Sequence, residues 1–188
     1  MELQDLLNKY KIKIDVDLIL SMWNESHRHF HNLDHLNDLI EQINLDLKKK
    51  DINHKEYEKL MIVAMFHDII YDPKKQDNEE KSAEFFLNVC QDKSNSDIKD
   101  INNAILDTKT HSSSTKLSEL FNLFDMNIVE RSYEELLNWE NGIYQEYKSY
   151  GDEFYKKGRL DFLNSLLDKY PNNTNNLLEL INYVKKHY

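Results

Sequence analysis

The chain has 188 residues, with 34 acidic and 24 basic side chains and a formal net charge of −10. An extended nucleic-acid surface is therefore not expected, because such a surface needs a basic face. Only three glycines and two prolines occur, which argues against sandwiches, barrels and doubly wound sheets, since these folds need many tight turns. An all-α fold is favoured, and the length suits a single domain of ~100–200 residues.

Apolar residues recur every three or four positions along most of the chain, which is the spacing of one helix face. The first part of the chain is predicted to hold short helices over 3–7 and 16–23, then longer helices over about 30–47 and 57–71. The last of these is apolar on nearly every face, as is typical of a central, buried helix. Asp72-Pro73 is expected to end it, because the residue before proline avoids the α region.

Six further helices are predicted from the same spacing, over about 78–90, 98–105, 117–128, 133–147, 154–170 and 175–187. A polar loop at 111–115 and a turn that begins at Pro171 separate some of them. We find no repeat, long linker or internal boundary. We therefore expect one all-α helical domain over residues 1–188.

Composition also bears on the cellular compartment. Cys90 is the only cysteine and cannot form an internal disulfide, which favours a reducing compartment. The acidic N-terminus lacks the pattern of a signal peptide, and the longest apolar run, 60–66, falls far short of the ~20 residues of a membrane helix. We expect a cytoplasmic protein without a membrane partner.

His67 and Asp68 stand within the most apolar stretch of the chain. Burying such a polar pair costs several kcal/mol unless it is hydrogen-bonded or bound to a cation. One interpretation is therefore a metal-binding pair. The other is a core histidine bonded to backbone carbonyls, with Asp68 exposed at a helix end.

Four of the eight histidines fall between positions 27 and 35. His31 and His35 are four residues apart and would share one face of a helix, where both could approach a divalent ion. The alternative is a solvated turn at a helix start, capped by Asn32 or Asp34. Imidazole and carboxylate donors without cysteine favour Mn, Fe, Ni, Co or Zn as a catalytic ion and make a structural zinc site unexpected.

A further acidic ligand is needed to complete such a site. Asp125 is the candidate, because it lies on a later helix that is otherwise apolar. Its alternative is a helix-end residue that faces water.

Five short stretches then occur in order, at 28–35, 66–71, 78–83, 105–111 and 125–126. His…His-Asp…Asp on successive helices resembles the HD superfamily of metal-dependent phosphohydrolases. The chain is most similar to a family of short predicted HD phosphohydrolases, whose members read Arg-His-Tyr-His-Asn-x-x-His, Phe-His-Asp-x-x-Tyr, Asn-Glu-x-x-Ser-Ala, Ile-Leu-x-Thr-x-x-His and Asp-Leu. The resemblance covers about residues 23–170, and residues 30–39 also resemble a signature of cyclic nucleotide phosphodiesterases.

The resemblance implies an HD-domain helical bundle and a set of site residues. The metal ligands implied are His35, His67, Asp68 and Asp125, and the catalytic residues implied are His31, Asp68 and Glu79. His31 would protonate the leaving oxygen, a task that suits the ordinary imidazole pKa of ~6.5. The cofactor implied is a divalent ion (Mn, Co, Ni, Fe, Zn or Mg), which lowers the pKa of bound water towards ~7.

Several other residues are candidates for contacts with the substrate. Arg28, Lys109 and Arg159 are candidate phosphate contacts, with an ordinary surface cation as the alternative for each. His111 would contact phosphate or a second metal, or is simply solvated. In HD nucleotidases and alarmone hydrolases an acidic residue near the position of Glu79 orients water or contacts substrate, whereas the alternative is a first-turn glutamate favoured by the helix dipole.

The chain departs from these families at three points. Leu123 stands where an Asp is usual, Tyr144 stands where an Arg is usual, and the longer motif for a second metal is absent after Asp68. A single metal ion is therefore expected.

The function expected is hydrolysis of a phosphate ester or anhydride of a small, nucleotide-like substrate. The alternative is a catalytically silent HD-fold module that binds a nucleotide or a protein partner. A metal-dependent oxygenase is a third, weaker hypothesis, because some HD proteins hold a di-iron pair. A homo-oligomer is compatible with the sequence.

Overall fold

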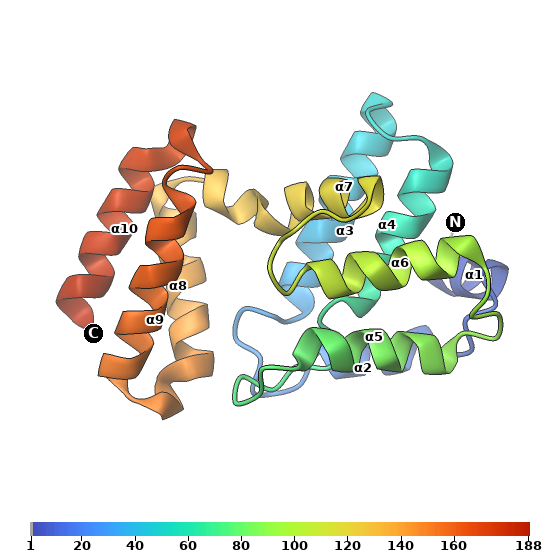
Figure 1. Cartoon of the computed structure of the whole chain (residues 1–188), viewed down its shortest axis with the longest axis horizontal. Coiled ribbons are helices and arrows are strands. Elements are labelled where there is room, and N and C mark those ends of the chain that lie inside the picture. Colours follow the sequence, from blue (N-terminus) through green and yellow to red (C-terminus); the bar gives the residue numbers. More distant parts are fainter. Residues whose placement is uncertain (1) are drawn as a thin grey trace. The chain divides into compact units, whose positions relative to one another are not determined.

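The computed structural model describes residues 2–188, and Figure 1 shows that they are organised as helices. Within that range the only β pairing is an isolated bridge between Ile12 and Cys90. The prediction of an all-α fold is confirmed. The α-helices are α1 (Leu3–Lys9), α2 (Val16–Trp23), α3 (Leu33–Lys49), α4 (His54–Phe66), α5 (Asn78–Val89), α6 (Ser96–Asp107), α7 (Lys116–Asp125), α8 (Tyr133–Tyr147), α9 (Asp152–Leu166) and α10 (Thr174–His187).

The helices form two compact units, residues 1–125 and 126–188. No internal boundary is expected from the sequence, whereas the contacts divide the chain at this point. It falls where α7 ends at Asp125 and the chain continues as a 3₁₀-helix, η1 (Met126–Glu130). The helix predicted over 117–128 is thus two elements, one in each unit.

The central helix of the first unit is α4. All residues from 60 to 66 are buried, and α4 packs against α3, α6 and α7. A capping box formed by Asn53 and Glu56 begins the helix. Each fully buried aliphatic or aromatic side chain contributes about 1.5–3 kcal/mol, so this helix is a main source of stability for the first unit. The predicted buried central helix is confirmed.

The C-terminal end of α4 differs from the prediction. The helix ends at Phe66 rather than at residue 71. Pro73 lies seven residues further on and is therefore not what ends it. The carbonyls of Asp68 and Ile69 accept hydrogen bonds from the Arg28 guanidinium instead of from helical N–H groups. His67 and Asp68 therefore lie at the end of the helix and not within it, which corrects the sequence-based expectation.

The N-terminal end of α3 is set by Asn32. Its side-chain oxygen accepts hydrogen bonds from the N–H groups of Asp34 and His35. His31 precedes this cap and lies in a turn. The expectation that His31 and His35 share a helical face is therefore wrong, although their ring centroids are only 6.2 Å apart.

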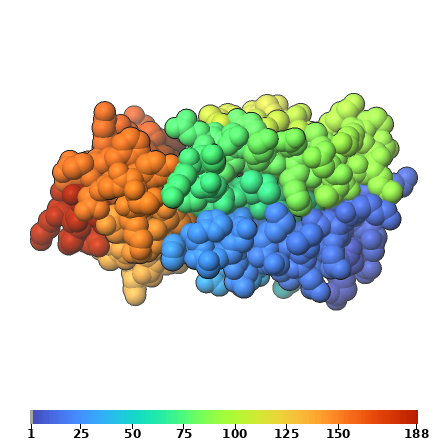
Figure 2. Space-filling model, turned by 90° about the horizontal axis from the view of Figure 1, so that it is seen from below, coloured from blue at the N-terminus to red at the C-terminus, as the bar shows by residue number. Residues whose placement is uncertain are grey.

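The N-terminal segment is attached to the rest of the first unit by backbone hydrogen bonds. Lys13 N–H donates to the carbonyl of Val89 over 2.7 Å, and Gln91 N–H donates to the carbonyl of Lys11 over 3.1 Å. In Figure 2 the N-terminal segment, in blue, lies directly beside the green segment that holds α5. The pairing thus connects the segment before α2 to the end of α5.

The second unit consists mainly of α8, α9 and α10, which pack on one another. Its most buried polar group is Glu140, whose side chain is 0% exposed. The Glu140 carboxylate accepts hydrogen bonds from Tyr155 Oη and from Arg159 Nε, each over 2.6 Å. The Arg159 guanidinium also lies 4.1 Å from the ring centroid of Trp139. The ion pair of Glu140 with Arg159 is therefore part of the core of the second unit.

None of the helices in the part of the chain that the structure describes combines the length and apolar character needed to cross a membrane.

The reactivity of Cys90 should be low in the folded protein. Burial raises the pKa of its thiol from 9.0 to about 11. The difference of two pKa units means that about 100-fold less thiolate is present at pH 8 than in the unfolded chain, and the thiolate is the nucleophile. We expect alkylation by iodoacetamide at pH 8 to be about 100-fold slower in buffer than in urea, as measured by mass spectrometry. Equal rates would show that Cys90 is accessible.

Candidate metal centre

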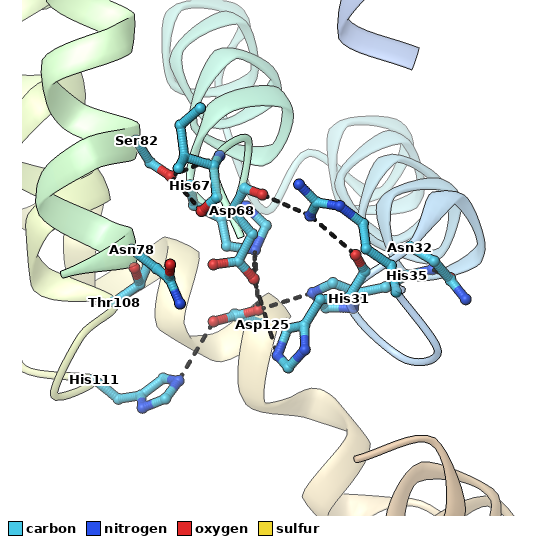
Figure 3. A network of polar contacts seen from close by, with 12 residues as sticks. His31, Asn32, His35, His67, Asp68, Asn78, Ser82, Thr108, His111 and Asp125 are labelled. Atoms are coloured by element: carbon cyan, nitrogen blue, oxygen red, sulfur yellow. Dashed lines mark hydrogen bonds and ion pairs between the residues drawn. The ribbon is translucent and has the colours of Figure 1, made fainter. Parts of the chain in front are cut away.

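The candidate site lies entirely in the first unit and gathers side chains from the ends of three helices (Figure 3). His35 stands in the first turn of α3, His67 and Asp68 follow the last residue of α4, and Asp125 is the last residue of α7. Helix ends supply these positions because the chain changes direction there and can direct several side chains to one point. The four ligands implied by the resemblance are thus brought together.

Ligand atoms of His35, His67 and Asp68 all lie within 4.8 Å of one another. Nε2 of His67 is 3.4 Å from Oδ2 of Asp68 and 3.6 Å from Oδ1 of Asp125. The same Oδ1 of Asp125 is 3.2 Å from Nε2 of His35. Two imidazoles and two carboxylates therefore converge on one small volume.

The protonation state of His67 is set by its surroundings. Nδ1 is 3.0 Å from the carbonyl of Ala64, which can only accept, so Nδ1 carries the proton of the neutral ring. Burial lowers the pKa of His67, and the nearby Asp68 and Asp125 carboxylates oppose this effect only in part. The neutral ring directs the lone pair of Nε2 towards the two carboxylates.

Aromatic side chains enclose the two imidazoles. The His67 ring centroid is 5.3 Å from that of Trp23 and 5.0 Å from that of Phe121, and the His35 ring centroid is 4.9 Å from that of Phe30. The Trp23 indole N–H donates to the carbonyl of Met65, which fixes the tryptophan in the core. These walls restrict rotation of the imidazoles and keep water away from their inner faces.

The Asp125 carboxylate is ionised in this environment. Burial raises its pKa, but hydrogen bonds from the His111 and His35 imidazoles outweigh burial and hold the pKa well below its ordinary value. His111 approaches from the opposite side to His35, with Nε2 3.4 Å from Oδ2 of Asp125. One carboxylate therefore connects the two inner histidines to a third, more exposed one.

These residues fit a bound divalent cation. Nε2 of His67 is buried and has no hydrogen-bond partner, a costly arrangement for a polar atom in a core. A proton on Nδ1 that is held by a backbone carbonyl is the usual outer-shell arrangement of a metal-binding histidine. Nitrogen and carboxylate donors without cysteine match Mn, Fe, Co, Ni or Zn, as the sequence analysis expects.

His31 borders this cluster without belonging to it. Its Nε2 is 4.0 Å from Oδ2 of Asp68, and its ring packs at 4.4 Å on that of Tyr71 and edge-on at 5.1 Å to Phe30. The His31 side chain is about one-fifth exposed. It is therefore placed to meet a ligand that comes from solvent.

His111 is held in an unusual backbone conformation. Its φ of 48° lies in the left-handed region, which residues other than glycine rarely adopt. The loop that imposes it is anchored at Asp107, whose carboxylate accepts hydrogen bonds from the N–H and Oγ of Ser114. This conformation places the imidazole beside Asp125.

Glu79 and Lys109 lie near the site on α5 and just after α6. Burial raises the pKa of the half-buried Glu79, and the Asp68 charge adds to this rise. Lys109 is exposed, and its Nζ donates to the carbonyl of Gln76 over 2.6 Å and to Oε1 of Glu80 over 2.5 Å. The roles of Glu79 and Lys109 in catalysis and substrate binding stay predictions.

The two arginines proposed as phosphate contacts have other partners. The Arg28 side chain is 0% exposed and donates to Glu25 and to backbone carbonyls, so it is not placed to contact a substrate. This corrects the expected role of Arg28 as a phosphate contact. The carbonyls of the residues after α4 lack helical N–H partners, and the Arg28 guanidinium bonds to them instead. Arg159 lies in the second unit, buried and paired with Glu140. We therefore omit both from the proposed substrate contacts.

Two of the three departures from the family pattern are single residues, and the structure shows where each lies. Leu123 is 66% exposed, and Asp125 is the α7 acid that reaches the histidines. Tyr144 belongs to the second unit, where its hydroxyl donates to Asp152 over 2.9 Å and its ring stacks on Tyr188.

The roles of Asn78 and Ser82 are not predicted from the sequence: both side chains come from α5 and hydrogen-bond the segment after Asp68. The sequence pattern does hint at buried contacts of these two side chains. Both are polar residues four positions apart on the buried face of the helix that also carries Ala83 and Phe86.

Comparisons with family models, with curated proteins and with solved structures find no match to this chain.

Proposed function

We propose that the chain is an HD-type metal-dependent phosphohydrolase that cleaves a phosphate ester or anhydride of a small, nucleotide-like substrate. The observation that carries the proposal is the unpaired, buried Nε2 of His67, which faces a second imidazole and two carboxylates. No hydrogen bond compensates for burying this atom. A bound cation would provide that compensation.

In this proposal His35, His67, Asp68 and Asp125 hold one divalent cation. When bound, the cation supplies an activated water at neutral pH and stabilises negative charge on the phosphoryl oxygens. The chain's own contribution is to hold the four donors in place. His67 is fixed through its Nδ1–H to Ala64, and Asp125 through its second oxygen, Oδ2, which lies 3.4 Å from His111 Nε2.

His31 is the proposed proton donor to the leaving oxygen. Packing against Tyr71 and Phe30 restricts its ring, while the exposed part of the side chain lets it meet a substrate. Its Nε2 lies 4.0 Å from Asp68 Oδ2, at the edge of the proposed ligand cluster. A histidine held at the border of the site is well suited to general acid catalysis.

The proposal is tested by elemental analysis of the purified protein, followed by a phosphate-release screen. The screen uses nucleotides, cyclic nucleotides and simple phosphoesters, each with Mn, Co, Ni, Fe, Zn and Mg. We expect bound metal and turnover of at least one class. Bound metal without turnover of any substrate would instead favour a catalytically silent module, and the absence of both would refute the proposal.

Replacing His31 by asparagine should separate proton donation from cation binding. We expect kcat to fall by about 10²–10⁴-fold for an alkyl or nucleoside ester, because general acid catalysis typically contributes that factor. An aryl ester whose leaving group needs no proton should lose much less. Steady-state kinetics with both substrates measure the difference.

His54→Asn is the matched control, since His54 is exposed at the start of α4. It should leave both rates unchanged. An equal loss on both substrates in His31→Asn would contradict a role as general acid.

A further inference from the structure

The segment of residues 68–72, which begins after the His67 cap of α4, has no helical or strand structure. Its backbone groups are nevertheless hydrogen-bonded, mostly to side chains from other elements. The carbonyls at positions 68 and 69 bond to Arg28, that at 70 to Ser82, that at 71 to His27, and that at 72 to Asn78. Side chains therefore determine the conformation of the segment that begins with Asp68.

On one side of the segment, Arg28 connects two parts of the candidate site. Its Nη1 donates to the carbonyl of Asp68 over 2.8 Å and to the carbonyl of His31 over 3.1 Å, and its Nη2 donates to the carbonyl of Ile69 over 3.0 Å. Nε donates to Glu25 over 3.0 Å. The guanidinium carbon lies 5.4 Å from the ring centroids of both Trp23 and Tyr71. One planar group thus fixes the backbone of the proposed proton donor relative to that of a proposed metal ligand.

On the other side, α5 supplies two paired hydrogen bonds. The Ser82 hydroxyl accepts from Ile70 N–H over 3.1 Å and donates to the carbonyl of Ile70 over 3.2 Å. The Asn78 side chain accepts from Asp72 N–H and donates to the carbonyl of Asp72, each over 3.0 Å. Each side chain thus binds both backbone groups of one residue, as a neighbouring strand would. Figure 3 shows Ser82 directed from α5 towards this segment.

We propose that Arg28, Asn78 and Ser82 are positioning residues, which hold the 68–72 backbone from two sides and thereby set the placement of Asp68 and His31. The inference rests on the proposed function, since it assigns these three residues to the geometry of that site. It also gives a physical reason for an arginine at position 28. A lysine could not bond three carbonyls that diverge in one plane, because it offers a single ammonium on a flexible stem.

The test uses Co²⁺ as the probe, with the full chain freed of metal by a chelator. Co²⁺ binding is followed by visible absorption, whose bands report ligand geometry. In Arg28→Lys and Ser82→Ala we expect the affinity for Co²⁺ to fall by about 10–100-fold, which is the usual effect of losing outer-shell partners. The absorption bands should also shift, which a loss of global stability alone would not cause.

Matched controls are Arg131→Lys, which changes an arginine of the second unit, and Ser165→Ala, which changes a serine of the second unit whose hydroxyl also donates to a backbone carbonyl. Neither should alter the affinity or the bands. If Arg28→Lys fails to fold, as judged by circular dichroism, Ser82→Ala decides the question. Unchanged affinity and bands in the folded variants would overturn the inference, as would an equal loss in Ser165→Ala.

Amide hydrogen exchange at Ile70 and Asp72 separates this inference from the proposed function. Loss of protection at Ile70 in Ser82→Ala is expected whether or not a cation binds, since the hydroxyl itself accepts that N–H. Protected amides in a wild-type protein that binds no Co²⁺ would refute the proposed function and, with it, the positioning role. Tight Co²⁺ binding with no effect of the variants would refute the positioning role alone.

Discussion

Replacing Asp68 by asparagine is expected to lower the affinity for a divalent cation by more than about 100-fold and to abolish phosphate release, since loss of outer-shell partners alone commonly costs 10–100-fold. Asp68 Oδ2 lies 3.4 Å from His67 Nε2. An amide at this position removes a charged metal ligand but keeps the shape of the side chain. Isothermal titration with Mn²⁺ or Co²⁺ measures the affinity, and the phosphate-release assay measures the activity.

The matched control is Asp100→Asn, which weakens the partly buried ion pair with Lys59 between α4 and α6. It should leave cation affinity and activity unaltered, because neither residue belongs to the candidate site. Full activity in Asp68→Asn would show that the candidate site is not the reaction centre. Loss of activity with cation affinity unchanged would remove Asp68 from the ligand set but keep it in catalysis.

Of the substitutions proposed here, Glu140→Ala should lower the free energy of unfolding the most. The fully buried carboxylate is paired with Arg159 and accepts from the Tyr155 hydroxyl, so its removal leaves a buried guanidinium without its counter-charge. Breaking such a pair from one side typically costs about 3–5 kcal/mol. Urea denaturation followed by tryptophan fluorescence measures the loss, and Trp139 reports directly on this unit.

Two further variants determine the origin of that loss. Glu134→Ala changes an exposed glutamate of the same helix and should cost no more than about 0.5 kcal/mol. Glu140→Leu combined with Arg159→Met should recover much of the loss, because an apolar pair leaves no buried charge uncompensated. If the double variant is as unstable as Glu140→Ala, packing volume rather than charge would be the cause.

Most of the fold could be predicted from the sequence. Apolar periodicity places α8 at residues 133–147, and the run from 60 to 66 identifies the buried centre of α4. The errors lie at helix ends, where long-range side chains decide the outcome. No local pattern shows that Arg28 captures the carbonyls after His67 and so ends α4 early, and local rules alone favour continuing that helix to the proline.

The candidate site could be predicted as a set of residues but not as an arrangement. The motifs give His35, His67, Asp68 and Asp125, which the fold brings together. They do not distinguish an arginine that meets a substrate from one that meets the backbone, because both need the same planar donors. The motif therefore predicts a phosphate contact for Arg28, whereas its guanidinium bonds to the backbone.

The hydrogen bonds from Arg28 to the carbonyls of Asp68 and Ile69 join positions 40 and 41 residues apart. A segment whose shape is imposed from so far away has no reason to adopt that shape in the unfolded chain. The donor atoms of the candidate site are therefore assembled only when the first unit folds. If the proposed function is right, a cation bound there would act as a folding ligand, and at a free concentration 100 times its Kd it would add about 2.7 kcal/mol to the stability of that unit.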